Sequence, residues 1–190
     1  MPMRAMLDSP WRATAMGLGV CALLLAAGVV LVGLERAALA DIVLRGSHVL
    51  AGLVWAGFIV FVNFVQLIAL AEAAEQERPV IVRLIVARTA RVFTAAAHAT
   101  LATGVMLLVL VWPNLAYRPM LTAGIIGGVA MWAIVQFILR PNVARITGRV
   151  SAGDQEKDEA RRSIALWARV NLVLVAPVTL AMLLAGHGIG

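Results

Sequence analysis

Five apolar stretches, each about 20 residues or longer, constrain this chain more than any other feature. They cover residues 15–34, 46–70, 92–112, 120–139 and 165–186, and the charged residues lie in short clusters between them. A helix rises about 1.5 Å per residue, so each stretch can cross a hydrocarbon layer of about 30 Å. Apolar residues make up 62% of the chain, against about 45–50% in soluble domains. We therefore predict an all-α integral membrane bundle of five transmembrane helices, forming one domain over residues 1–190.

The distribution of basic residues predicts the orientation of this bundle. Thirteen of the 16 Lys and Arg residues fall on one side of the predicted helices, and the other side has only Arg36, Arg45 and Arg118. Cytoplasmic loops carry the excess of Lys and Arg. We therefore expect a multi-pass protein of the plasma (bacterial inner) membrane, with its N-terminus cytoplasmic and its C-terminus external.

The longest predicted loop covers residues 141–162 on the cytoplasmic side. Its charged part, residues 154–162, can form a helix supported by pairs such as Asp158 and Arg162. This segment is either a solvated helical start of the fifth span or a docking site for a soluble partner. Within the spans, Pro177 predicts a kink. Small residues predict close helix contacts at Gly52, Gly57, Gly104, Gly124, Gly127 and Gly128.

Composition excludes several functions. The formal net charge is +6, but the basic residues lie at span ends, where membrane topology explains them, so we expect the lipid bilayer as partner and no nucleic acid. Cys21 is the one cysteine, which rules out a disulfide within the chain and a C-x-x-C-H site for covalent haem. Nucleotide-binding and hydrolase motifs are absent. No pair of carboxylates lies within a span, which disfavours coupled transport.

The three histidines are the candidates for chemistry, because ionisable residues at membrane depth are costly. His48 lies about 4–5 Å below the outer boundary, and His187 follows the fifth span at the outer surface. His98 is about 15 Å lower than His48, near or below the midplane. Two imidazoles from facing helices can hold a haem iron, and depth favours His48 with His187. A histidine can equally bond a neighbouring helix, and the Gly-His-Gly end can be an exposed tail.

Other residues can line the site of this histidine pair or replace one of its members as an iron ligand. His48, Gly52, Trp55 and Ile59 recur at helical spacing on one face, with Asn63 and Gln66 further along. Gly52 leaves room for a macrocycle and Trp55 can line it, or this face is a helix contact with Asn63 and Gln66 as interhelical hydrogen bonders. Met106 and Met182 lie near the depth of His48 and can serve as axial ligands. A second set can bind a haem propionate or a quinone head group: Arg91, Thr94 and His98.

The order of motifs resembles a known family. The segment 44–57, with His48, Gly52, Trp55 and Gly57, resembles the opening helix of the membrane domain of bacterial urate oxidases that carry a cytochrome c. It is distantly similar to the copper-resistance D proteins and the membrane protoporphyrinogen oxidases. The segment 98–104, which resembles the Thr-x-x-Gly helix of the family, Pro141-Asn142, and the Asn171…His187 helix follow in the family order. The resemblance implies a haem-b membrane domain with ligands at His48 and His187.

These observations lead to one leading hypothesis. We expect a haem-b-binding membrane electron-transfer subunit that works with an external redox partner such as a cytochrome c. The cofactor site would comprise His48 and His187 as iron ligands, with Gly52, Trp55 and His98 nearby. The alternatives are a non-catalytic anchor or assembly subunit of a larger complex and a permease for a metal or small solute. Nothing in the sequence identifies a catalytic residue.

Overall fold

The computed structural model describes residues 8–111 and 118–188. These residues form helices and no strand, which confirms the all-α prediction. Five of the helices are long and apolar enough to cross a membrane. The chain divides into two compact units, residues 1–44 and 45–190. Trp112, the last residue of the third predicted stretch, lies outside the described residues.

The first unit contains α2 (Pro10–Val32), which has no buried residue. Pro10 occupies the first turn, where its missing N–H leaves no hydrogen bond unmade. The helix ends at Gly33, whose φ of 69° is a left-handed conformation that glycine adopts without steric strain. Large side chains such as Leu23, Leu31 and Val32 are 71–82% exposed. An apolar helix with this much exposed surface is suited to lipid contact.

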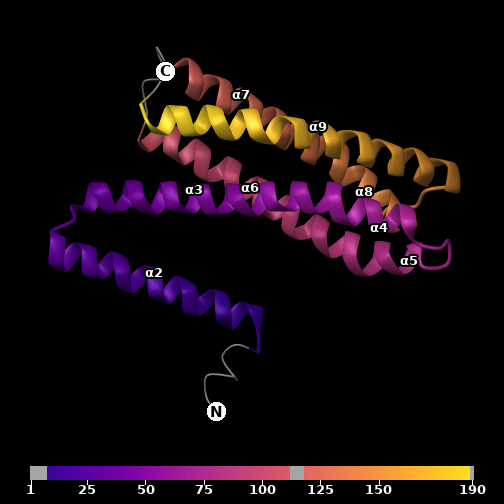
Figure 1. Ribbon diagram of the computed structural model, residues 1–190, viewed down its shortest axis with the longest axis horizontal. Coiled ribbons are helices and arrows are strands. Elements are labelled where there is room, and N and C mark those ends of the chain that lie inside the picture. The colour runs from indigo at the N-terminus through magenta and orange to yellow at the C-terminus, as the bar shows by residue number, and fades with distance from the viewer. Residues whose placement is uncertain (1–7, 112–117, 189–190) are drawn as a thin grey trace. The chain divides into compact units, whose positions relative to one another are not determined.

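The second unit is built from four long helical rods (Figure 1). The first joins α3 (Arg36–Phe61), η1 (Val62–Gln66) and α4 (Leu67–Glu72); α3 begins in the first unit. The second joins α5 (Arg78–Ile81), η2 (Val82–Val86) and α6 (Ala87–Leu110). The third joins α7 (Pro119–Ala133), η3 (Ile134–Leu139) and α8 (Arg140–Ile146). The fourth is α9 (Asp154–Gly186), which continues through Pro177. We call the two ends of this unit the α8–α9 end and the α6–α7 end.

The rods are longer than the apolar stretches that predicted them. The expected loop 141–162 shrinks to residues 147–153, because α8 continues to Ile146 and α9 begins at Asp154. Apolar length reports the hydrocarbon thickness, whereas a helix continues into solvent wherever side chains support it. Asn142 provides such support by donating to Ser163 Oγ at 3.0 Å, which joins α8 to α9. The loop itself turns at Gly148, where φ is 73°.

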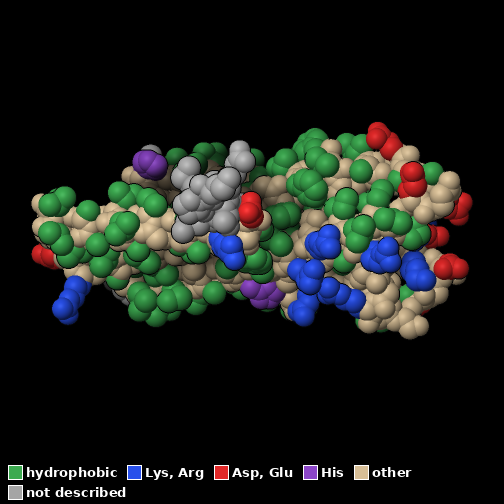
Figure 2. All heavy atoms as spheres, turned by 90° about the horizontal axis from the view of Figure 1, so that it is seen from below, with side chains coloured by type: hydrophobic (Ala, Val, Ile, Leu, Met, Phe, Trp, Pro, Cys, Tyr) green, Lys and Arg blue, Asp and Glu red, His purple; other side chains and the backbone are tan. Residues whose placement is uncertain are grey.

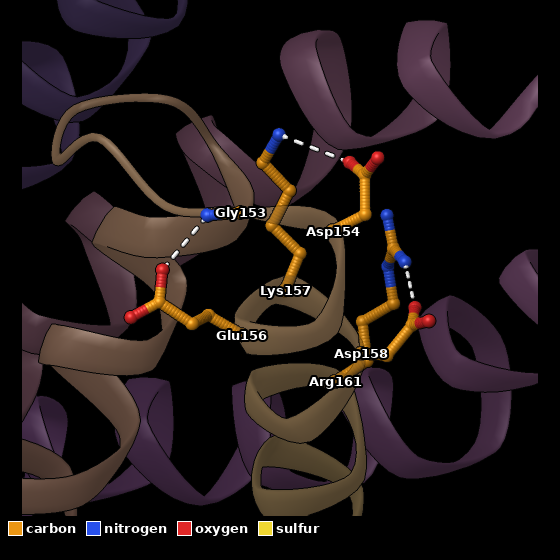
Figure 3. Close-up of polar contacts among 6 residues, drawn as sticks. All are labelled: Gly153, Asp154, Glu156, Lys157, Asp158 and Arg161. Carbon is orange, nitrogen blue, oxygen red and sulfur yellow. Dashed lines mark hydrogen bonds and ion pairs between the residues drawn. The ribbon is translucent and has the colours of Figure 1, made fainter.

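The start of α9 confirms that the charged segment is helical. The backbone N–H of Gly153 donates to Glu156 Oε2 at 2.8 Å (Figure 3). This contact satisfies an N–H that the helix itself cannot pair. Lys157 lies 3.7 Å from Asp154, and Arg161 pairs with Asp158. These pairs lie at the surface, where such interactions stabilise weakly, so the segment is a capped, solvent-exposed start of α9.

Each π-helical segment, η1, η2 and η3, lies in the half of its rod toward the α8–α9 end, and two have identifiable causes. In η1, Asn63 Nδ2 donates to the Ile59 carbonyl at 2.8 Å. The side chain thereby competes for a carbonyl oxygen that normally accepts a backbone N–H of the α-helix. After η3, Pro141 has no N–H to give to the preceding turn. The next residue, Asn142, adds a side-chain hydrogen bond to the Ile138 carbonyl at 2.9 Å. Both interruptions favour the wider π turn.

The core of the second unit contains residues from all four rods. Trp55, Phe93, Val135 and Ile164 are among its buried members. The tightest helix contact joins α7 and α9, where Gly127 faces Val178 and Gly124 faces Met182. Gly124 and Gly127 therefore confirm the prediction of close packing at small residues.

Hydrophobic side chains also cover much of the surface, and on the face in Figure 2 most charged side chains gather at the right, where α4, α5 and α8 lie in Figure 1. Each of the four rods carries exposed large apolar side chains, among them Leu53, Val109, Phe137 and Val173, as expected of a multi-pass membrane protein.

Candidate functional site

His48 is held against α6 by a hydrogen bond that crosses between helices. Its Nδ1 lies 3.0 Å from the carbonyl oxygen of Thr100 and 3.1 Å from Thr103 Oγ1. A carbonyl oxygen only accepts, so Nδ1 carries the hydrogen and donates it. The Thr103 hydroxyl donates to the Ala99 carbonyl at 2.7 Å, and its lone pairs face the imidazole. These contacts fix both the ring orientation and the tautomer of His48.

The second ring nitrogen of His48, Nε2, is the atom available to coordinate a metal. With the hydrogen on Nδ1, Nε2 keeps its lone pair. Within the described part of the chain, Nε2 has no hydrogen-bond partner. The ring is half-buried, and its neighbours Val49 and Leu50 are exposed. Metal-binding histidines commonly donate their second ring N–H to a backbone carbonyl, which orients the ligating nitrogen. His48 has this arrangement.

Gly104 makes the arrangement sterically feasible. A Cβ at this position would lie 3.1 Å from Cε1 and 3.5 Å from Nδ1 of His48. The glycine therefore provides the space into which the imidazole packs. The predicted close contact at Gly104 is confirmed, and its partner is the histidine ring.

The first rod turns toward the bundle the face that carries His48, Gly52, Trp55 and Asn63. Gly52 lies opposite Thr100, with Cγ2 4.0 Å from where a Cβ would be. Trp55 is 6% exposed and packs in the core with Phe93. Asn63 donates to the Ala168 carbonyl of α9 at 3.1 Å, which confirms its predicted interhelical bond. At Gly57 and Gly128, by contrast, an added Cβ would meet no atom within 4 Å among the described residues, so neither glycine makes the close helix contact expected of it.

His98 occupies a separate place on α6. It is exposed, and its Nδ1 donates to the Thr94 carbonyl of its own helix at 2.7 Å. Its ring meets the indole of Trp132 edge-on, with centroids 5.8 Å apart. Among the described residues, no hydrogen bond or ring contact joins His98 to His48 or Arg91, and Arg91 is exposed. The structure therefore places His98 beside the third rod and does not bring it to His48.

His187 lies at the last turn of α9. It is exposed, and its Nδ1 donates to the Leu183 carbonyl at 2.8 Å. Nε2 is again the unbonded nitrogen, but no hydrogen bond or ring contact joins His187 to His48 in the described residues. Of the two methionines, Met182 packs its sulfur against Gly124 and Met106 is 48% exposed. His48 is thus the histidine with an interhelical hydrogen bond.

Three buried polar residues form a group that the sequence pattern does not bring together, although it predicts Gln66 as an interhelical hydrogen bonder. Gln66, Thr89 and Asn171 are 6%, 7% and 0% exposed, and they line one cavity between the rods. The sequence does carry a signal for them, because a polar residue inside a span needs a partner. A criterion based on ionisable residues does not detect Thr89 or Asn171, because threonine and asparagine carry no charge.

No three His, Cys, Asp or Glu side chains gather into a metal-binding group in the described residues. A haem differs from such a centre because the porphyrin supplies four of the iron ligands and the protein one or two. Comparisons of the chain with protein-family models, curated proteins and solved structures gave no match, so the functional argument rests on the geometry around His48.

Proposed function

We propose that this chain is a haem-b-binding membrane subunit that transfers electrons to or from an external redox protein, with His48 as an axial ligand of the iron. The observation that carries the proposal is the hydrogen bond from His48 Nδ1 to the Thr100 carbonyl. It leaves Nε2 as a neutral imidazole donor of the kind that iron binds. A bound haem would supply one-electron chemistry.

The residues around His48 fit the role of a ligand-holding shell. Thr100 and Thr103 keep the ring from rotating, and Gly104 lets it approach α6. A preoriented imidazole loses little conformational freedom when it binds iron. The ring is half-buried and not fully enclosed, as the proposal requires. His187, with its own Nε2 unbonded, is the proposed second ligand.

The orientation of the bundle decides which compartment the site faces. The basic residues predict that the α8–α9 end is cytoplasmic. His48 packs against the part of α6 between Thr100 and Gly104, toward the α6–α7 end. The proposed haem therefore lies near the external surface of the plasma membrane. Short distances favour electron transfer, so an external cytochrome c is the proposed partner.

The proposal is tested by the visible spectrum of the purified protein. The full chain is expressed with haem precursor in the medium and purified in mild detergent. We expect a Soret band, an α band on reduction with dithionite, and equimolar protohaem in a pyridine haemochrome assay. A monodisperse protein that contains no haem, and takes up none when titrated with haemin, would leave the membrane-anchor alternative in its place.

A further inference from the structure

A cavity of about 50 Å³ lies between the four rods, in the half of the second unit toward the α8–α9 end. Each π-helical segment contributes to its wall: Gln66 from η1, Val86 from η2 and Leu139 from η3. Asn171 of α9 completes it. π-helical turns are rare and often occur at functional sites. Three of them line this one cavity, which makes it the first place to look for a second site.

Two amide side chains in the wall lack partners. Asn171 is 0% exposed, and neither Nδ2 nor Oδ1 has a hydrogen bond within the described residues. Gln66 is 6% exposed, and its Oε1 is likewise unbonded there. An amide left without partners in an apolar interior is strongly unfavourable. A small rotation of the terminal amide is inexpensive by comparison, because that torsion is broad. Both groups can therefore turn toward an occupant of the cavity.

The wall specifies the chemistry of that occupant. None of the lining residues is ionisable, so the occupant is neutral. Asn171 offers both donor and acceptor atoms and Gln66 offers an acceptor, so the occupant must donate and accept. One water needs about 10–15 Å³ of such space, whereas an aromatic ring needs a cavity of about 150 Å³. The volume of about 50 Å³ thus accommodates a few waters and excludes a quinone ring.

The α8–α9 end also carries an open, polar cavity, which we call the vestibule. This second cavity, of about 350 Å³, is lined by Arg145, Glu156, Glu159 and Ser163, among others. Asn142 and Ser163 line the vestibule, and the next residues along the chain, Val143 and Ile164, line the inner cavity. The two cavities are therefore lined by consecutive residues of both α8 and α9.

From these observations we propose that the inner cavity is a hydration site, in which water bound by Asn171 and Gln66 penetrates the bundle from the α8–α9 end. The site is independent of His48 and of any haem, because no residue of the His48 shell lines it. The four rods then enclose water in the half toward the α8–α9 end.

Water-edited solid-state NMR of the full chain in lipid bilayers tests this proposal. The side-chain amides of Asn and Gln and the Trp indoles carry ¹⁵N, and Asn171→Leu and Gln66→Leu assign the two key signals. We expect magnetisation from water to reach Asn171 about as fast as it reaches Asn142 in the vestibule. Transfer to the buried indole of Trp132, which lines neither cavity, should be several-fold slower.

If a variant does not fold, sequential assignment of the parent protein identifies the two signals, so the measurement on the parent still decides the matter. Transfer to Asn171 as slow as to Trp132 means a dry cavity and overturns the proposal. Cross-peaks from Asn171 to protons of a lipid or another organic molecule, in place of water, overturn it as well. Ala168→Leu provides a matched filling variant, since Ala168 lines the cavity and is 4% exposed. In a folded Ala168→Leu protein we expect the fast water transfer to Gln66 to be lost.

Discussion

The close contact of α7 with α9 leads us to predict that alanine substitution has different effects at two adjacent glycines, Gly127 and Gly128. A Cβ added at Gly127 would lie 2.4 Å from Val178 Cγ2, whereas a Cβ at Gly128 would meet no atom within 4 Å. Carbon atoms pack at about 3.5–4.0 Å, so Gly127→Ala creates an overlap of about 1 Å. Val178 cannot rotate away easily, because a valine in a helix is nearly confined to one rotamer. The two helices must therefore separate.

The magnitude follows from two opposing terms. Overpacking of this kind costs about 1–3 kcal/mol, and replacing glycine by alanine in a helix gains about 0.5–1 kcal/mol. Gly128→Ala gains the same helix stability, and its new Cβ overlaps no neighbouring atom. We expect Gly127→Ala to be less stable than Gly128→Ala by about 1–3 kcal/mol. Reversible unfolding in mixed micelles, followed by circular dichroism and tryptophan fluorescence, measures the difference.

A double-mutant cycle isolates the cause. Val178→Ala removes the methyl group that clashes, so Gly127→Ala should be tolerated in that background. Equal stability of the Gly127→Ala and Gly128→Ala proteins would refute the close packing of α7 on α9. So would a Gly127→Ala penalty that Val178→Ala leaves unchanged.

Three further predictions concern the site, the capped helix and the orientation. Gly104→Val should displace the His48 ring and lower haem content, whereas Gly57→Val, at a position where an added Cβ meets no atom within 4 Å, should leave haem content unchanged; pyridine haemochrome assays compare the two. Glu156→Ala removes the acceptor of the Gly153 N–H and should lower the free energy of unfolding by about 1 kcal/mol, which Glu156→Gln should largely restore. A C-terminal alkaline phosphatase fusion should be active and a C-terminal green fluorescent protein fusion dark, whereas the reverse pattern would place the C-terminus in the cytoplasm.

The helices are well predicted from the sequence because their physical cause is local. A long uncharged stretch must pair its own backbone groups in lipid, and only a helix does so within one segment. The helix ends are less predictable. Asn142 bonds Ser163 across 21 positions in the chain, and no local pattern reports such a tertiary contact. For this reason the predicted loop 141–162 is too long.

Around His48, too, the local features could be predicted from the sequence and the tertiary contacts could not. Helical spacing puts His48, Gly52 and Trp55 on one face, and that face is the one turned toward the bundle. The partner of His48 is a backbone carbonyl, which every residue has and which no motif can identify. The π-helical segments likewise depend on single side chains that capture a carbonyl, as Asn63 does. These features emerge only from the three-dimensional arrangement.

The pairing of His48 with His187 stays a prediction. The two residues lie on different rods, and each has Nδ1 bonded to a carbonyl and Nε2 unbonded. Depth in the membrane, counted along the sequence, favours this pair over His98. A His187→Ala protein that keeps its haem but changes its reduced spectrum is the expected result, because the loss of one of two axial ligands alters the iron while His48 retains it.

The most direct test of the central claim is the haem content of His48→Ala, measured beside His98→Ala and the parent. We expect a monodisperse His48→Ala protein that inserts normally and has lost its haem, because the iron has lost its oriented imidazole. Adding imidazole to the buffer should restore part of the absorbance. His98→Ala should retain the parent spectrum, since His98 bonds Thr94 of its own helix and its ring contacts Trp132. A folded His48→Ala protein with full haem content and an unchanged spectrum would contradict the assignment of His48 as a ligand.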